Sequence, residues 1–416
     1  MHVIVMGAGL MGVTTAYYLA REGHQVTVVD RRADVAQETS FANAGLLTPG
    51  HASAWASPRA PMILLQSLWR NDTSLRYRLK LDPRMWIWTW QFLANCTSER
   101  NRRNTLIKLH LCLHSQQETD RVTRDTGIAW DRTSKGALYL HRDKNQMQAA
   151  QANFAMMHDE GIKLRTIGME EVIALEPALA SSKEKLVGAI YVESDESGDA
   201  RKFTEALANI CRGLGVTFRF NERIDRIAGD GDGVTGVHSQ LGGLKGDAYV
   251  LAFGSYSPQL VRPLGLKLPV YPVKGYSVTV PLRDPAAAPT IGGVDEQNLV
   301  AFSRLGDRLR LTGTADFCGY DTEFEAHHFT HMLKVARELF PQGGSYDQPD
   351  YWACLRPMTP DGPPIIGRSA IHNLWLNTGH GHMGWTMACG SSHILSDLMA
   401  NRKPAIDPAG LRPDRY

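Results

Sequence analysis

Short apolar runs and a helix-compatible segment alternate at the start of the chain. Residues 3–6 are all apolar, which is typical of a buried parallel strand. A helix-compatible stretch follows to about Glu22, and Gly23 ends it. Residues 25–29 form a second strand-like run that ends at Asp30. This order predicts a β-α-β unit at the N-terminus.

Three glycines stand between the first strand and the helix. Gly7, Gly9 and Gly12 have the G-x-G-x-x-G spacing of dinucleotide-binding proteins. In that motif the first glycine permits a tight turn, the second a close approach of the backbone to a pyrophosphate, and the third close packing of the helix on the strand. The helix N-terminus would present free N–H groups to the diphosphate. The carboxylate of Asp30 can bind the two hydroxyls of a ribose and would repel a 2′-phosphate, which argues against NADP. The positive charge of Arg31 weakens that argument. The predicted dinucleotide contacts here are Gly7, Ala8, Gly9, Leu10, Met11, Gly12, Asp30 and Arg31.

The rest of the predicted dinucleotide domain is interrupted. Small residues without strand periodicity occupy 39–47, and a Trp-rich region follows at 55–90. Apolar strands that run into glycine turns return only at 247–254 and at 373–379, the latter followed by a helix to about Ala400. A nicotinamide-binding Rossmann domain usually continues with further β-α units. The interrupted order therefore favours FAD over NAD.

The middle of the chain has other periodicities. Residues 76–170 are predicted to be mainly helical around one strand at 135–141. Residues 200–214 form an amphipathic helix that Asp199 can cap. Short runs of alternating apolar and polar residues at 268–349 predict an antiparallel sheet.

Together these patterns predict an α/β protein with a Rossmann-type FAD-binding domain and a second α+β substrate domain built on an antiparallel sheet. At 416 residues, 43% of them hydrophobic, the chain is long enough for two domains. The predicted FAD-binding domain comprises 1–75, 170–267 and 350–416, and the substrate domain comprises 76–169 and 268–349.

The composition of the chain indicates which binding partners and which cellular compartment to expect. The 45 basic side chains nearly balance 43 acidic ones, so no nucleic acid partner is predicted. Six cysteines without a CxxC pair fit a reducing compartment. The first strand leaves no room for a signal peptide, and no apolar run approaches the ~20 residues needed to cross a bilayer. A cytoplasmic, non-spanning protein is expected.

The sequence as a whole resembles the D-amino acid oxidase-like flavoproteins, and among them the bacterial D-amino acid dehydrogenases of the small-subunit type. The segments that carry this resemblance are GAGLMG (7–12), ETSFANAG (38–45), YPVKGY (271–276), LRPMTPDG (355–362), NTGHG (377–381) and GWTMACG (384–390). It implies an FAD-dependent oxidative deamination of a D-amino acid. A hydride would leave Cα for flavin N5, and the imino acid would hydrolyse to a 2-oxo acid and ammonia. The electrons would pass to a quinone or another non-oxygen acceptor.

Arg356 is the residue best suited to bind the substrate. Its planar guanidinium can bind a carboxylate through two parallel hydrogen bonds, and by the resemblance it occupies the place of the family's carboxylate-binding arginine. The alternative is an ordinary ion pair. Pro357 after it favours an extended segment. Tyr271, Tyr276 and His51 are further candidates for the substrate pocket, or else packed core residues.

The terminal glycine motif is the second candidate site. Gly379, Gly381 and Gly384 allow the backbone to pack against a flat ring system. A helix that begins near Gly384 would aim its N-terminal N–H groups at the flavin N1–C2=O edge, where negative charge accumulates on reduction. The other predicted cofactor contacts are Ser40, Asn43, Ala44, Gly45, Leu46, Ile224, Gly254, His380, Met383, Trp385 and Thr386.

Several alternatives stay open at this stage. Some relatives attach FAD through a cysteine near the conserved arginine; Pro357 stands at that position, so non-covalent FAD is expected. Met383 stands where some family oxidases carry an oxygen-activating lysine, which favours a dehydrogenase. The other functions considered are an oxygen-using oxidase of D-amino acids, glycine or sarcosine, a dehydrogenase of D-proline or hydroxy-D-proline, and a non-catalytic flavin-binding subunit. No metal site is predicted.

The Trp-rich region has two interpretations. Its aromatic, apolar and basic residues are Trp69, Trp86, Trp88, Trp90, Leu79, Leu81, Arg76, Arg78 and Lys80. They would either dip into a membrane interface or pack inside a helical insertion. The first interpretation places the protein peripherally on the cytoplasmic face of the inner membrane, near a quinone.

Overall fold

The β-α-β unit expected at the start of the chain is present. The residues that the computed structural model describes are 1–67, 75–78, 80–230 and 232–416. β1 (His2–Met6) and β2 (Gln25–Val29) pair in parallel, and α1 (Leu10–Arg21) connects them. After its first residue each strand is buried throughout, as expected for a parallel sheet.

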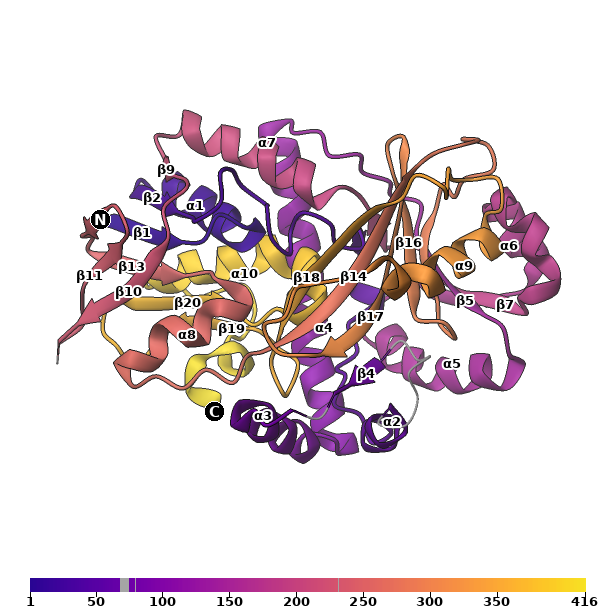
Figure 1. Cartoon of the computed structure of the whole chain (residues 1–416), viewed down its shortest axis with the longest axis horizontal. Coiled ribbons are helices and arrows are strands. Elements are labelled where there is room, and N and C mark those ends of the chain that lie inside the picture. Colours follow the sequence, from indigo (N-terminus) through magenta and orange to yellow (C-terminus); the bar gives the residue numbers. More distant parts are fainter. Residues whose placement is uncertain (68–74, 79, 231) are drawn as a thin grey trace.

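This unit belongs to a six-stranded sheet with the order β19-β20-β13-β1-β2-β9, which lies toward the end of the molecule that holds the N-terminus (Figure 1). The other strands of this sheet are β9 (Thr217–Arg219), β13 (Ala248–Leu251), β19 (Ile365–Arg368) and β20 (Leu374–Thr378). All pairs are parallel except that of β19 with β20. The strands predicted within 247–254 and 373–379 are confirmed as β13 and β20, so the sheet is assembled from distant pieces.

A nine-stranded sheet fills the other half of the molecule, with the order β18-β14-β17-β16-β15-β5-β7-β6 and β4 paired to β17 (Figure 1). Its strands are β4 (Leu75–Tyr77), β5 (Ala137–His141), β6 (Leu164–Ile167), β7 (Gly188–Val192), β14 (Tyr271–Pro281), β15 (Gly292–Asp295), β16 (Val300–Leu305), β17 (Arg308–Phe317) and β18 (Asp350–Met358). Most pairs are antiparallel, as predicted, but β15 pairs in parallel with β5 and β17 with β4. Alternation within a strand does not say which distant strand will pair with it, so these two pairings were missed.

The helices cover the sheets and join them. They are α2 (Ala60–Ser67), α3 (Pro83–Ala94), α4 (Ser98–Thr126), α5 (Lys144–Asp159), α6 (Met169–Leu175), α7 (Ala200–Gly213), α8 (Ser257–Val261), α9 (Thr330–Leu339) and α10 (Gly384–Met399). Asp199 caps α7 as predicted, because its carboxylate accepts hydrogen bonds from two first-turn N–H groups. Leu214, the last residue of the predicted helix 200–214, lies just beyond α7 and is exposed. α10 packs against both α1 and α4.

Short strands complete the fold. They are β3 (Leu46–Leu47), β8 (Glu196–Ser197), β10 (Ile224–Gly229), β11 (Val234–Ser239) and β12 (Gly242–Leu244). β3 and β8 pair with each other, and β10, β11 and β12 form a small antiparallel sheet.

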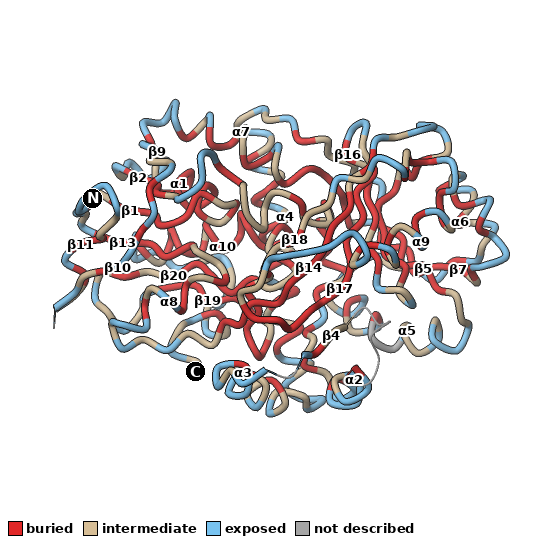
Figure 2. Tube along the Cα trace, viewed as in Figure 1, coloured by how far each residue is buried: buried red, intermediate tan, exposed pale blue. Residues whose placement is uncertain are grey.

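Burial is concentrated where the strands of the two large sheets run (Figure 2). β7 and β18 are both strands of the nine-stranded sheet, although their residues fall in segments that the sequence assigned to the FAD-binding domain. The predicted domain boundaries stay a prediction. Among the described helices, none combines the length and the apolar character needed to span a membrane.

Candidate active site

A cavity of about 1090 Å³ is lined by residues of both large sheets. Its walls come from the β1–α1 turn, the segment 38–46, the residues after β13, the strands β14, β17 and β18, and the start of α10. Pockets for drug-sized ligands measure roughly 300–1,000 Å³. The cavity therefore lies at or above the upper end of that range, as expected of a site for a large ligand.

The glycine motif forms one end of this cavity. Gly7 has φ 109°, and a Cβ there would lie 2.8 Å from the carbonyl oxygen of Ala252. A Cβ at Gly12 would lie 1.8 Å from the carbonyl oxygen of Gly7, so only glycine permits this packing of α1 on β1. Gly9 begins α1 without a side-chain cap, and the nearest atom to a Cβ there is Ser40 Oγ, at 3.5 Å. The Leu10 N–H donates to the Ser40 hydroxyl at 3.0 Å, and Gly9 itself provides no side chain, so the helix N-terminus beside it can approach a pyrophosphate.

Asp30 follows β2 and lines the same end of the cavity. Its carboxylate accepts hydrogen bonds from the N–H groups of Ala8 at 2.7 Å and Arg32 at 2.8 Å. Burial raises the pKa of Asp30, and these two hydrogen bonds oppose the rise. The guanidinium of Arg31 lies over the ring of Tyr256, 4.5 Å from its centroid. The carboxylate is thus placed where a ribose hydroxyl pair of a dinucleotide would need it.

The segment 39–45 is attached to the nine-stranded sheet. Arg310 donates a hydrogen bond to the carbonyl oxygen of Asn43 at 3.0 Å, and the Ser303 hydroxyl donates to that of Ala44 at 2.7 Å. Burial lowers the pKa of Arg310 to about 10, so this guanidinium is still charged at neutral pH. The two strands β16 and β17 therefore position the segment that lines the cavity.

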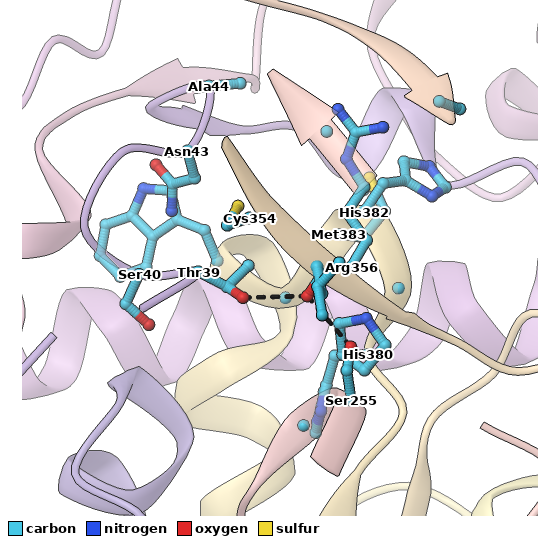
Figure 3. A pocket seen from close by; sticks show the side chains of 18 of the residues that line it. Thr39, Ser40, Asn43, Ala44, Ser255, Cys354, Arg356, His380, His382 and Met383 are labelled. Atoms are coloured by element: carbon cyan, nitrogen blue, oxygen red, sulfur yellow. Dashed lines mark hydrogen bonds between the residues drawn. The ribbon is translucent and has the colours of Figure 1, made fainter. Parts of the chain in front are cut away.

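Arg356 extends from β18, and Figure 3 shows it in the pocket together with His380 and His382. Its guanidinium donates hydrogen bonds to the carbonyl oxygens of Thr314 at 2.8 Å and Gly313 at 3.4 Å. Burial lowers its pKa, and no carboxylate of the described residues forms an ion pair with it. The guanidinium is half-buried and faces the cavity, so a ligand carboxylate there would supply the anionic partner that the described residues do not.

Strands β14 and β17 leave room for this guanidinium and orient it. A Cβ at Gly275 would lie 2.6 Å from Cζ of Arg356. The register between β14 and β17 shifts between Lys274 and Tyr276, and Thr314 lies in β17 at this irregularity with φ 59°. A β-branched residue rarely adopts such a backbone conformation. The strain at Thr314 coincides with the carbonyl that receives the shorter hydrogen bond from Arg356.

The residue before Arg356 is anchored from two sides. The hydroxyls of Thr39 and Ser255 both donate hydrogen bonds to the carbonyl oxygen of Leu355, at 3.0 and 3.1 Å (Figure 3). Burial raises the pKa of the nearby Cys354 thiol to about 11, so it is protonated at neutral pH. β18 thus presents Arg356 from a fixed backbone, next to a neutral thiol.

The predicted terminal helix begins at Gly384, as α10. Its N-cap residue Met383 makes no side-chain cap, so the open N-terminus lies at the wall formed by Gly384, Trp385 and Thr386. Gly381 has φ 58°, a conformation that favours glycine. The dipole of α10 therefore favours negative charge at this wall.

Two histidines stand beside this helix start, His380 buried and His382 half-buried. His380 shares a hydrogen bond with the Ser391 hydroxyl at 3.0 Å, and burial lowers its pKa to about 3. His382 stacks on Trp55 with centroids 4.8 Å apart; burial first, and then nearby cations, hold its pKa well below the usual range. Both imidazoles are therefore neutral at physiological pH.

His51, a half-buried lining residue, belongs to a network of polar side chains. Burial alone would lower its pKa, but the hydrogen bond to Glu296 at 3.2 Å and the charge of that carboxylate raise it overall. The imidazole stacks on Tyr139, whose hydroxyl donates to Asp195 at 2.6 Å. Burial raises the pKa of Asp195 to about 7. Asp195 and Tyr139 are not lining residues, so they act on the cavity only through His51.

Comparison with known proteins now identifies the family, because a family model described as "FAD dependent oxidoreductase" matches residues 2–398. The chain belongs to the FAD dependent oxidoreductase family. It is 46% identical over 419 residues to the D-amino acid dehydrogenase of Bradyrhizobium diazoefficiens, covering 100% of this chain and 99% of that protein. It is 45% identical to D-amino acid dehydrogenase 2 of Mesorhizobium japonicum, covering 99% of both.

Solved structures of other enzymes share the fold. The glycine oxidase from Geobacillus kaustophilus superimposes with a TM-score of 0.76 at 22% identity, covering 100% of this chain and 98% of that one. The L-proline dehydrogenase from P. horikoshii has a TM-score of 0.76 at 16% identity, covering 100% and 97%. At such identities the likeness shows the fold alone.

Most residues predicted to contact FAD or substrate line the cavity of this FAD dependent oxidoreductase. They are Gly7, Gly9, Leu10, Met11, Asp30, Arg31, Ser40, Asn43, Ala44, Gly45, Leu46, His51, Ile224, Gly254, Tyr276, Arg356, His380, Gly381, Met383, Gly384, Trp385 and Thr386. Ala8, Gly12 and Gly379 lie behind the wall. Gly12 is packed under Gly7, and a Cβ at Gly379 would lie 2.8 Å from the Thr359 side chain. Their predicted contact with FAD stays a prediction.

The two predicted tyrosines differ. Tyr276 lines the cavity, and its hydroxyl donates to Asp316 at 3.1 Å. Tyr271 is a packed core residue, with ring centroids 6.0 Å from Trp88 and 6.3 Å from Phe317. Of its two interpretations, the structure therefore favours the core. The apolar cluster around α3 takes up its ring, which the sequence alone could not reveal.

Sequence analysis missed Lys108, a buried lysine of α4 beside the cavity. Its ammonium donates a hydrogen bond to the carbonyl oxygen of Ser53, a lining residue, at 3.0 Å. Burial lowers its pKa to about 8, against the opposing influence of Cys112 and Asp361. One sequence signal was available, since Lys108 stands between apolar residues of a long helix.

The buried ammonium predicts a pH dependence of stability. Between about pH 8 and the unfolded pKa of ~10.4 the unfolded chain binds more protons at Lys108 than the folded one. The free energy of unfolding contributed by this group therefore rises with pH across that window. We expect Lys108→Met to be more stable than the wild type at pH 7.5, by a margin that shrinks at pH 9.5. Urea unfolding at both pH values measures it.

The exposed Lys163 provides the control for this prediction. Lys163→Met removes the same charge from the surface and should change the free energy of unfolding by the same amount at both pH values. If Lys108→Met changed the free energy of unfolding equally at pH 7.5 and 9.5, the lowered pKa of Lys108 would be contradicted.

Proposed function

We propose that this flavoprotein is a D-amino acid dehydrogenase that deaminates its substrate oxidatively and passes the electrons to a quinone or another non-oxygen acceptor. The observation that carries the proposal is Arg356, a half-buried cation on the cavity wall with two carbonyl partners and no carboxylate partner among the described residues. A substrate carboxylate would complete this site. The curated relatives that match the whole chain at 42–46% identity are named D-amino acid dehydrogenase, which supports the handedness.

The residues of the cavity have separable tasks in such a reaction. Arg356 would hold the carboxylate and thereby fix the direction of the Cα–H bond. The neutral His380 and His382 add no charge that would repel a substrate cation or bind a second anion. Bound non-covalently, FAD supplies the acceptor for the hydride from Cα. The open N-terminus of α10 favours the negative charge that this transfer delivers.

An anaerobic titration followed by flavin absorbance tests the proposal. The purified holoenzyme is mixed with D-alanine, D-proline and their L-enantiomers. We expect the D-forms to bleach the flavin band and the L-forms to leave it unchanged. Bleaching by L-forms only, or by neither, would refute the assignment, and the ratio of D-proline to D-alanine reports side-chain preference.

The acceptor is tested in the same cuvette. Air admitted to the reduced enzyme should restore the flavin band slowly, whereas a soluble quinone should restore it within the mixing time. Fast reoxidation by air with stoichiometric peroxide would favour an oxygen-using oxidase instead. Met383, at the N-cap of α10, stands where some family oxidases carry an oxygen-activating lysine, and this supports the dehydrogenase.

Helices α2 and α3 support a further part of the proposal, contact with the membrane that holds the quinone. Trp86, Ile87 and Trp90 on α3 are exposed by 41%, 60% and 70%, while Trp88 is buried. Other exposed apolar residues nearby are Met62, Ile63, Leu65 and Leu81. Both helices lie along one edge of the molecule (Figure 1). Trp69 and Leu79, also predicted to take part, lie outside the described residues.

Replacement of all three exposed residues of α3 by serine (Trp86, Ile87 and Trp90) should reduce co-sedimentation with anionic phospholipid vesicles roughly tenfold or more, because each buries apolar area in the interface. Flavin reduction by substrate should be unchanged. Leu241→Ser is the matched control, since this leucine is also exposed but lies on the β11–β12 turn. Equal sedimentation of wild type and triple variant would remove this surface from the proposal.

A further inference from the structure

Away from the cavity, the packed helices α4 and α10 bring together two histidines and a glutamate. His114 Nε2 lies 3.2 Å from His393 Nδ1, and His393 Nδ1 lies 3.8 Å from Glu118 Oε1. The possible ligand atoms of these three residues all lie within 4.8 Å of one another. Histidine and glutamate are frequent ligands of Zn²⁺.

Each helix contributes a histidine and a carboxylate four residues later, and such pairs share a helix face. On α4 the pair is His114 and Glu118; on α10 it is His393 and Asp397. Asp397 Oδ2 lies 4.0 Å from His393 Nε2, on the far side of the ring from His114. A carboxylate that accepts a hydrogen bond from the outer nitrogen is the usual support of a metal-binding imidazole; at 4.0 Å Asp397 makes an ionic contact and would have to move closer to form that bond.

The spacing of the two imidazoles is close to what a metal requires. Two nitrogens bound tetrahedrally at ~2.0–2.1 Å from Zn²⁺ lie roughly 3.3–3.4 Å apart, and the observed separation is 3.2 Å. Tyr18 donates a hydrogen bond to Glu118 Oε2 at 2.9 Å, which leaves Oε1 toward the histidines. Arg121 lies 3.7 Å from Oε1, so its charge would have to be displaced or offset.

The surroundings permit loading from solvent. His114 and Glu118 are buried, whereas the side chain of His393 is 21% exposed, so an ion can enter on one side and keep a water as a fourth ligand.

We propose that His114, Glu118 and His393 bind a divalent transition-metal ion, best matched by Zn²⁺, that joins α4 to α10. This site lies outside the cavity lining and does not depend on the proposed reaction. The ion would act structurally on the helix whose N-terminus forms part of the cavity wall. The sequence did not predict it because His114 and His393 are 279 residues apart.

The test uses the tag-free, FAD-containing enzyme and Zn²⁺ alone. Calorimetric titration should show one ion bound per chain, and thermal unfolding should move to higher temperature with Zn²⁺. His114→Ala and His393→Ala should each abolish saturable binding, and Asp397→Asn should weaken it about 10–100-fold, as expected for a residue that only supports a ligand. Diffraction at the zinc edge should place an anomalous peak between the three residues.

His110 provides the matched control, because it lies one turn earlier on α4, is exposed and pairs with Glu160. His110→Ala should bind Zn²⁺ as the wild type does. Binding that survives both His114→Ala and His393→Ala, the absence of saturable binding, or an anomalous peak elsewhere would overturn the proposal in favour of a plain hydrogen bond between imidazoles. If the alanine variants lose FAD, the anomalous peak of the unmodified enzyme decides alone.

Discussion

Arg356→Gln is expected to lower kcat/KM for a D-amino acid roughly 10²–10⁴-fold, because hydrogen bonds to a charged group contribute about 1.5–3 kcal/mol each and two would be lost. Arg356→Lys keeps the charge but loses the planar fork, so it should fall between the wild type and Arg356→Gln. Reduction of the flavin by saturating substrate, measured by stopped flow, separates binding from the chemical step. A simple carboxylate competitor should lose affinity in parallel with the substrate.

Arg304 is the matched control for this prediction. It lies on β16 of the same sheet and also donates to backbone carbonyls, those of Gly306 and Pro285, but it is not a lining residue. Arg304→Lys should leave kcat/KM unchanged. Normal FAD content in all variants is required, since loss of the cofactor would mimic loss of the carboxylate site. Full activity of Arg356→Gln would show that the substrate carboxylate binds elsewhere.

The local parts of the site were predictable from the sequence. The glycine turn, the start of α10 at Gly384 and the extended strand around Arg356 each depend on residues adjacent in the chain. Turn geometry and strand periodicity are properties of such short segments. The sequence therefore located most of the cavity wall, and the resemblance supplied the expected role of Arg356.

The supporting parts were not predictable, because they depend on contacts between distant segments. Arg310 reaches Asn43 across 267 residues, and Ser303 reaches Ala44 across 259. Neither residue differs in type from an ordinary polar residue of a strand. The backbone strain at Thr314 likewise follows from the irregular pairing of β14 with β17. A threonine in the sequence gives no sign of such an irregularity.

Two glycines of the same motif are expected to fail in different ways when replaced by alanine. A Cβ at Gly12 would meet the carbonyl oxygen of Gly7 at 1.8 Å, a contact with backbone that only a shift of α1 can relieve. Gly12→Ala should therefore destabilise the FAD-free chain itself, by about 3 kcal/mol or more. A Cβ at Gly9 would meet only Ser40 Oγ, at an ordinary 3.5 Å. Gly9→Ala should leave the FAD-free chain as stable as the wild type.

The defect of Gly9→Ala should instead appear in FAD affinity. Its new methyl group would occupy the space into which the pyrophosphate must approach, which we expect to weaken FAD binding roughly 10–100-fold. Urea unfolding of the FAD-free proteins and fluorescence titration with FAD separate the two effects. Gly213→Ala, in α7 with open space around its Cβ, controls for the glycine-to-alanine change and should not reduce stability. If Gly9→Ala bound FAD normally, the pyrophosphate would not lie at this turn, and the glycine motif would serve only to pack α1 on β1.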